Sequence, residues 1–190
     1  MPDDPWLKTA KRFDRVLYES GIPFCFIGGV AVQCWGEPRG TRDVDAAVYA
    51  PLGEKAAAVK LMPGSFTAAE QNSFEKARVT RVLLLQEPDE GVGIDVSLAA
   101  AQFKFDAIER SVRQRLAPGV SLRVCGPEGL IVYKAFAGRP IDWRDVEGIL
   151  IRQQGRLDFE LVEANLRPLC DLKENPDLFR QYEVLRDRYR

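Results

Sequence analysis

Hydrophobic and polar residues follow helical spacing at both ends of the chain and form short alternating runs between them. The first apolar stripe opens after Asp4-Pro5 and closes at Gly21, and helical spacing returns after Pro127. The middle of the chain carries short apolar runs separated by glycine- and proline-rich turns, which is typical of strands. The pattern predicts strands at 23–27, 43–49, 79–85, 92–98 and 122–125. It predicts helices at 5–21, 30–35, 52–62, 103–112, 128–138, 142–154, 158–172 and 176–189.

These elements define an α+β fold class, with a mixed β-sheet core flanked by helices and a carboxy-terminal helical cap. The chain has 190 residues, 46% of them hydrophobic, which is enough for one domain with a small appendage. The change to continuous helix after Pro127 predicts an α/β core at residues 1–126 and a helical region at 127–190 packed on it.

Two acidic residues alternate on one predicted strand, in Asp43-Val44-Asp45. Successive strand side chains point to opposite faces, so Asp43 and Asp45 share a face while Val44 points into a core. At about 5 Å and an effective dielectric of about 20, their repulsion is on the order of 3 kcal/mol, which requires a counter-charge. A bound Mg²⁺ would supply it, and so would Arg39 and Arg42.

The complete absence of histidine narrows the chemistry open to this site. Histidine-dependent triads and histidine-bound metal sites are excluded, so a general base must be another residue. Asp95, in Ile94-Asp95-Val96 on a second predicted strand, is the candidate. Mg²⁺ takes one or two protein carboxylates together with water and substrate phosphates. Metal-assisted phosphoryl chemistry is therefore the first hypothesis.

Candidate phosphate-binding residues surround these carboxylates. Gly28-Gly29 forms a turn before a short helix whose first amides would face a phosphate. Arg39, Thr41 and Arg42 lie in the loop before the paired aspartates, where the guanidinium groups either grip a triphosphate or only neutralise those aspartates. Lys134 lies on a later helix, where it either contacts the β- or γ-phosphate or belongs to a solvated face.

The order of these motifs resembles the nucleotidyltransferase superfamily of DNA polymerase beta. Ile27-Gly28-Gly29 is similar to its first motif, Asp43-Val44-Asp45 to its paired metal ligands, and Ile94-Asp95-Val96 to its third carboxylate. Lys134 and Arg139, followed by Asp142 and Asp145, resemble the helical segment of the abortive-infection (AbiEii-type) toxin branch. The resemblance covers roughly residues 20 to 155.

The resemblance implies an enzyme dependent on Mg²⁺ or Mn²⁺. It would move a nucleoside monophosphate from an NTP to a hydroxyl or phosphate acceptor and release pyrophosphate. Asp43 and Asp45 would bind the metals that hold the triphosphate, and Asp95 would complete the metal site and activate the acceptor. The acceptor remains open among tRNA, a protein and a small molecule. The resemblance also favours the phosphate-binding role of Lys134.

Two other functions use the same residue types. The first is a nucleotide- or partner-binding module that has lost catalysis, such as one component of a toxin–antitoxin-like pair with an antitoxin-like protein partner. The second is a Mn²⁺-dependent glycosyltransferase, which also uses Asp-x-Asp. Gly28-Gly29 ahead of the aspartates and the short chain disfavour the glycosyltransferase.

Charge and apolar run lengths bear on partners and location. Lys and Arg total 27 against 28 Asp and Glu, a net charge of −1, so any nucleic-acid contact must use a local basic patch. No apolar run approaches about 18 residues, and the amino terminus is acidic and proline-rich. We therefore expect a cytoplasmic protein with no membrane partner.

Overall fold

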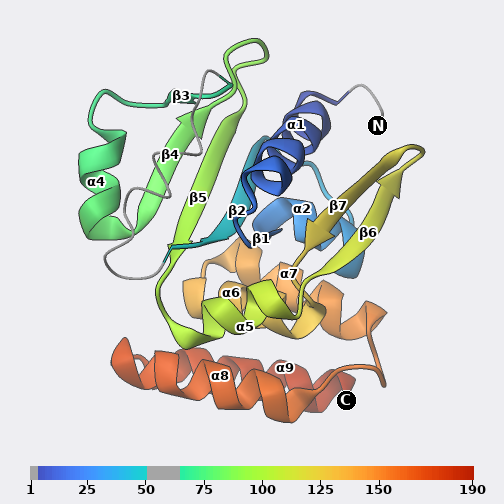
Figure 1. Ribbon diagram of the computed structural model, residues 1–190. Helices are drawn as coiled ribbons and strands as arrows, with labels where there is room; N and C mark the ends of the chain where they lie inside the picture. Colours follow the sequence, from blue (N-terminus) through green and yellow to red (C-terminus); the bar gives the residue numbers. More distant parts are fainter. Residues whose placement is uncertain (1–3, 51–64) are drawn as a thin grey trace.

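The computed structural model describes residues 4–50 and 65–190. Within these ranges, seven strands form one mixed sheet in the order β3-β4-β5-β2-β1-β7-β6 (Figure 1). The strands are β1 (Phe24–Phe26), β2 (Asp43–Tyr49), β3 (Thr67–Ala68), β4 (Val82–Gln86), β5 (Gly93–Ala99), β6 (Val112–Ala117) and β7 (Val120–Val124). The helices are α1 (Pro5–Ser20), α2 (Gly28–Trp35), α4 (Ser73–Thr80), α5 (Gln102–Glu109), α6 (Pro127–Ala137), α7 (Pro140–Arg152), α8 (Phe159–Leu172) and α9 (Pro176–Tyr189). The predicted α+β class, with its mixed sheet and carboxy-terminal helices, is confirmed.

Strand β2 lies at the centre of the sheet. It pairs antiparallel with β1 and parallel with β5. The parallel register places Asp45 opposite Asp95. The antiparallel register places Phe26 opposite Ala46. Because strand side chains alternate between faces, Phe26 and Ala46 share one face, and the carboxylates of Asp45 and Asp95 lie on the other.

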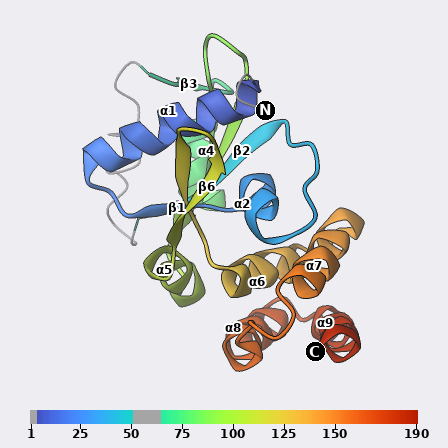
Figure 2. The ribbon, with the colours of Figure 1, turned by 90° about the vertical axis from the view of Figure 1, so that its right-hand side faces the viewer.

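Helix α1 covers the face that carries Phe26. Its buried stripe includes Phe13, whose ring meets those of Phe26 and Phe66 edge to face, with centroids 6.4 and 5.2 Å apart. Figure 2 shows α1 on one side of the sheet and α5, α6 and α7 on the other, with α8 and α9 in a further layer. The acidic face of β2 and β5 is therefore the one opposite α1.

Proline and glycine set the ends of several helices. Helices α1, α6, α7 and α9 carry proline in their first positions, where the missing amide has no intrahelical partner. Helices α1 and α6 end at Gly21 and Gly138, whose φ angles of 68° and 72° are left-handed and unstrained only for glycine. These local signals explain why the predicted breaks at Gly21, at 138–140 and at 175–176 are confirmed.

The predicted helix at 103–112 is wrong at its carboxy-terminal end. Helix α5 ends at Glu109, and Val112 begins β6, an unpredicted strand that forms a hairpin with β7. Strand β6 lies at one edge of the sheet, and most of its residues are exposed or half-buried. An exposed edge strand has little apolar patterning to reveal it.

The predicted strand at 79–85 begins too early. Val79 and Thr80 close helix α4, Arg81 has a left-handed φ of 61°, and the strand begins at Val82. The β-branched residues favoured a strand locally, but the surrounding structure extends the helix through them. Helix α4 and the short strand β3 were not predicted.

Helix α2 begins earlier than expected. The turn expected at Gly28-Gly29 is already the first turn of α2. The helix expected at 52–62 lies outside the described residues, and the domain boundary after residue 126 stays a prediction.

No helix in the described ranges combines the length and apolarity needed to cross a membrane.

Replacing Phe13 with alanine should destabilise the protein by about 3–5 kcal/mol, because the ring is fully buried and leaves a cavity between α1 and the sheet. Tyr18→Ala on the same helix is the control, since Tyr18 is 72% exposed. Denaturant unfolding measures both. Equal losses of stability in the two variants would contradict this packing of α1.

Candidate active site

Three carboxylates come together on the sheet face opposite α1. Asp43 and Asp45 lie two residues apart on β2, and Asp95 lies opposite Asp45 on the parallel strand β5. Asp43 is exposed, and the other two are half-buried. In the described residues, no lysine or arginine forms an ion pair with any of the three. The sequence therefore predicted a juxtaposition that the structure contains.

The environment of Asp45 disfavours its charge. Burial, followed by the charges of Asp43 and Asp95, raises the pKa of Asp45 to about 6, against smaller opposing effects from Lys134 and the Gly29 amide. Burial and Asp43 also raise the pKa of Asp95. Mutual repulsion in a partly desolvated site thus leaves this carboxylate cluster short of positive charge.

The two glycines pack the start of α2 against this cluster. Gly28 has a φ of 56°, and a β-carbon there would overlap the carboxylate of Asp45. A β-carbon at Gly29 would overlap the side chain of Thr41. The Gly29 amide donates to the Asp45 carboxylate. The glycines therefore have a packing role, which is separate from the phosphate contact predicted for them.

Two polar residues of the loop before β2, Thr41 and Arg42, have different surroundings. The Thr41 hydroxyl lies 3.1 Å from both the backbone oxygen and a carboxylate oxygen of Asp43. Arg42 is exposed and makes no hydrogen bond or ion pair with the described residues. Of the loop residues predicted to bind phosphate, Arg42 is thus the cation that the described structure leaves unpaired.

Lys134 is held inside the protein by two acidic residues of α7. Its ammonium lies 3.1 Å from Asp142 and 2.9 Å from Asp145. Lys134 is 6% exposed, so the alternative that it lies on a solvated helix face is wrong. Its charge still acts on Asp45, whose pKa it lowers. Lys134 is therefore near the carboxylate cluster and bonded to other acids.

Two arginines complete this ion-pair network. Arg39 donates from two nitrogens to the two carboxylate oxygens of Asp145, each over 2.8 Å. Arg139 donates to both oxygens of Asp142, over 2.6 and 3.1 Å. Arg39 thus pairs with Asp145, a partner that neither interpretation of this residue anticipated. The field of Asp43 contributes only a minor part of the raised pKa of Arg39.

The acids of this ion-pair network have lowered pKa values, whereas Asp45 and Asp95 of the carboxylate cluster have raised ones. Burial raises the pKa of Asp142 and Asp145, but bonds from Arg139, Arg39 and Lys134 outweigh it, so both pKa values lie below the ordinary value. In the sequence, only the family resemblance singles out these two acids. Their spacing of three, which puts both on one face of a helix, was the available signal.

The carboxylate cluster supplies oxygen ligands, which suit Mg²⁺ or Mn²⁺. Among the described residues, no group of three or more histidine, cysteine, aspartate or glutamate side chains is arranged so that it could hold a metal ion. Mg²⁺ needs only one or two protein carboxylates, with water and phosphate oxygens filling the other positions. The donor chemistry and the unpaired charge of Asp45 therefore fit a cation that arrives with a nucleotide.

No family model and no curated protein matches this chain. Solved structures do. An antigenic nucleotidyltransferase-like protein from Paracoccidioides brasiliensis aligns at 15% identity and a TM-score of 0.51, covering 95% of this chain and 93% of its own. The antibiotic-resistance factor ANT(2'')-Ia aligns at 17% identity and a TM-score of 0.55, covering 88% and 92%. The fold therefore resembles that of nucleotidyltransferases.

Replacing Asp45 with asparagine should stabilise the protein more at pH 7 than at pH 4, in the absence of divalent cations. The pKa of about 6 in the folded state exceeds the ordinary aspartate value of 3.8, so the folded state binds more protons between these two pH values, and its stability falls as pH rises through them. With allowance for solvent screening, the gain between the two pH values should be about 1–2 kcal/mol. Denaturant unfolding at both pH values measures it, and a gain no larger than that of the exposed Asp171→Asn control would contradict the assignment.

Gly28→Ala should cost about 2–4 kcal/mol of stability, because the new methyl group meets the Asp45 carboxylate and the backbone is left-handed. Gly40→Ala is the matched control, since nothing lies within 4 Å of a β-carbon at Gly40. The control should change stability by less than about 0.5 kcal/mol. Thermal and denaturant unfolding of the pair measure the difference, and similar losses would show that α2 does not start against Asp45.

Proposed function

We propose that this protein is a Mg²⁺-dependent nucleotidyltransferase that moves a nucleoside monophosphate from an NTP to a hydroxyl or phosphate acceptor and releases pyrophosphate. The observation that carries the proposal is the placement of Asp43, Asp45 and Asp95 on one sheet face, where no described lysine or arginine forms an ion pair with them. The resemblance of the fold to nucleotidyltransferases supports it. A structural ion-pair network would have brought cations to these three residues, as it does to Asp142 and Asp145.

The carboxylates of Asp43, Asp45 and Asp95 would supply one or two ligands to each Mg²⁺ ion, with Mn²⁺ as a substitute, and water and phosphate oxygens would fill the other positions. Bound there, the ion would neutralise triphosphate charge and lower the pKa of the acceptor hydroxyl. Asp95 would accept the proton of that hydroxyl, and its raised pKa suits a general base. The acceptor oxygen forms a bond to the α-phosphorus while the bond from that phosphorus to pyrophosphate breaks.

The triphosphate would lie between the start of α2 and the loop before β2. Gly28-Gly29 lets the side chains of Asp45 and Thr41 pack against the start of α2, and Thr41 and Arg42 are the loop groups nearest to Asp43 in sequence. Arg42 is free to pair with a phosphate. Arg39 and Lys134 would attract the triphosphate at a distance. Their ion-pair network contains three cations and only two carboxylates, so it carries a net positive charge.

Within the superfamily, we place the chain closest to the AbiEii-type toxin branch. The network that joins Lys134, Arg139, Asp142 and Asp145 supports this, because these are the residues that carry the resemblance to that branch. An antitoxin-like protein partner and a cytoplasmic location belong to the same proposal. The acceptor would be a tRNA, a protein or a small molecule.

A second candidate is a nucleotide- or partner-binding module without turnover. The observation in its favour is that two of the cations expected to hold the triphosphate, Arg39 and Lys134, are already bonded to Asp145 and Asp142. Phosphate binding through these cations would require them to leave or share their partners. The two candidates differ in turnover, which a direct assay separates.

Each NTP with Mg²⁺ should raise the melting temperature of the wild type by roughly 5–10 °C for a nucleotide at 100 times its Kd. The Asp43→Asn, Asp45→Asn double variant should lose this shift, because it removes two carboxylates from the cluster. The exposed Asp171→Asn variant is the control and should keep it.

Pyrophosphate release with candidate acceptors then distinguishes the two candidate functions. Release by the wild type and its loss in the double variant support the transferase. A metal-dependent shift without release for any acceptor class favours the binding module. No shift with any NTP would contradict both nucleotide-based candidates.

A further inference from the structure

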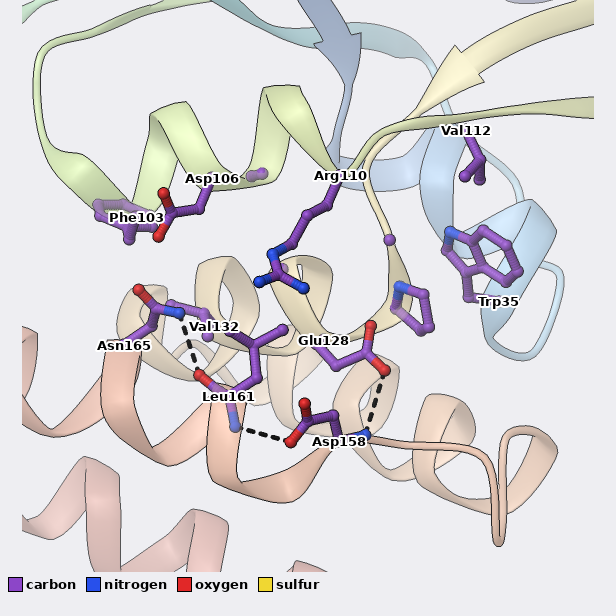
Figure 3. A pocket seen from close by; sticks show the side chains of 14 residues that line it. Trp35, Phe103, Asp106, Arg110, Val112, Glu128, Val132, Asp158, Leu161 and Asn165 are labelled. Carbon is purple, nitrogen blue, oxygen red and sulfur yellow. Dashed lines mark hydrogen bonds between the residues drawn. The ribbon is translucent and has the colours of Figure 1, made fainter.

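A separate cavity of about 320 Å³ lies between α5 on one side and α6 and α8 on the other (Figure 3). Its volume falls within the range of roughly 300–1,000 Å³ that is typical of small-ligand pockets. Trp35, at the carboxy-terminal end of α2, forms part of its wall. The residues of the carboxylate cluster and its ion-pair network do not line it. The mechanism described above leaves this cavity unused.

The walls of the cavity are largely apolar. Phe103 of α5, Val132 of α6 and Leu161 of α8 contribute side chains from three helices, and the indole of Trp35 faces the same space. The indole nitrogen is already bonded to the backbone oxygen of Cys125 over 2.7 Å, which fixes the ring. A preformed apolar wall of this kind selects a ligand with an apolar body.

An exposed guanidinium group, that of Arg110, lines the open side of the cavity, and no described side chain pairs with it. Arg110 extends from the end of α5 towards this space, as Figure 3 shows. It makes no side-chain hydrogen bond and no ion pair with the described residues. A guanidinium placed over an apolar floor without a partner matches a carboxylate, which accepts two of its N–H groups.

Three carboxylates line the same cavity as Arg110, and each already accepts one bond inside the protein. Asp106 accepts from Gln102 over 2.8 Å, Glu128 from the Asp158 amide over 3.2 Å, and Asp158 from the Leu161 amide over 3.0 Å. Each retains a second oxygen that accepts no bond from the described residues. These oxygens match a group with several N–H donors, such as an ammonium.

We propose that this cavity binds a free α-amino acid with an apolar side chain. Arg110 would hold its carboxylate, the second oxygens of the acids that line the cavity would accept from its ammonium, and the apolar walls would cover its side chain. A simple amine leaves Arg110 unpaired beside a second cation, and a simple carboxylic acid meets three negative charges without an ammonium to offset them. Each terminus of a peptide carries only one of the two charges, so the free amino acid fits best.

Isothermal titration of the full-length wild type with L-phenylalanine and L-leucine tests the proposal. L-phenylalanine should bind at least tenfold more tightly than 2-phenylethylamine, which lacks the carboxylate, and 3-phenylpropionate, which lacks the ammonium. Equal binding of the three phenyl compounds would overturn the proposal. So would the absence of measurable binding of either amino acid up to about 10 mM.

Two variants locate the binding. Arg110→Gln and Asp106→Asn should each weaken L-phenylalanine at least tenfold, because each removes a charge that pairs with the zwitterion. Arg78→Gln is the matched control, since Arg78 is exposed on α4 and does not line the cavity. Melting curves establish that the variants fold. Unchanged affinity in both cavity variants would show that the amino acid binds elsewhere and would overturn the assignment.

Discussion

The parallel pairing of β2 with β5 is the constraint on which the site depends. Its register runs from Asp43 opposite Gly93 to Tyr49 opposite Ala99, and it places Asp45 opposite Asp95. The same alternation buries Val44, Ala46 and Ile94 against the core. A slip by one residue would bury the carboxylates and expose the apolar set, so the hydrophobic core and the acidic site specify the same register. Stability of the sheet and placement of the candidate site are therefore one requirement.

The carboxylates of the candidate site and of the neighbouring ion-pair network fall into two electrostatic classes. Asp142 and Asp145 are bonded to Lys134, Arg39 and Arg139, and their pKa values are low. Asp45 and Asp95 have raised pKa values because burial and like charge act on them, and no cation within residues 4–50 and 65–190 forms an ion pair with either. Basic side chains therefore neutralise the two acids of α7, whereas the acids of the sheet have no such ion pairs with described residues. Ionisable side chains with strongly shifted pKa values are typical of functional sites.

Much of this arrangement could be predicted from sequence, because it depends on local patterns. The alternation in Asp43-Val44-Asp45 identifies a strand and its acidic face, and proline and glycine identify the helix ends after residue 126. The pairing of Arg39 with Asp145 could not be predicted in this way, since the two are 106 residues apart and the loop offered nearer acids. The exposed edge strand β6 lacks an apolar pattern, and at Val79 the surrounding structure overrides local preference.

Carboxyl-detected NMR titration of Asp45, with and without Mg²⁺ and a non-hydrolysable NTP, would show whether a metal and a nucleotide bind at these carboxylates. We expect Asp45 to titrate near its pKa of about 6 in the free protein. We expect a pKa below about 5 once the metal and nucleotide are added, because an adjacent cation favours the ionised form. A midpoint near 6 that neither ligand moves would show that no cation binds at these carboxylates. That result would contradict the assignment of this sheet face as a metal–nucleotide site.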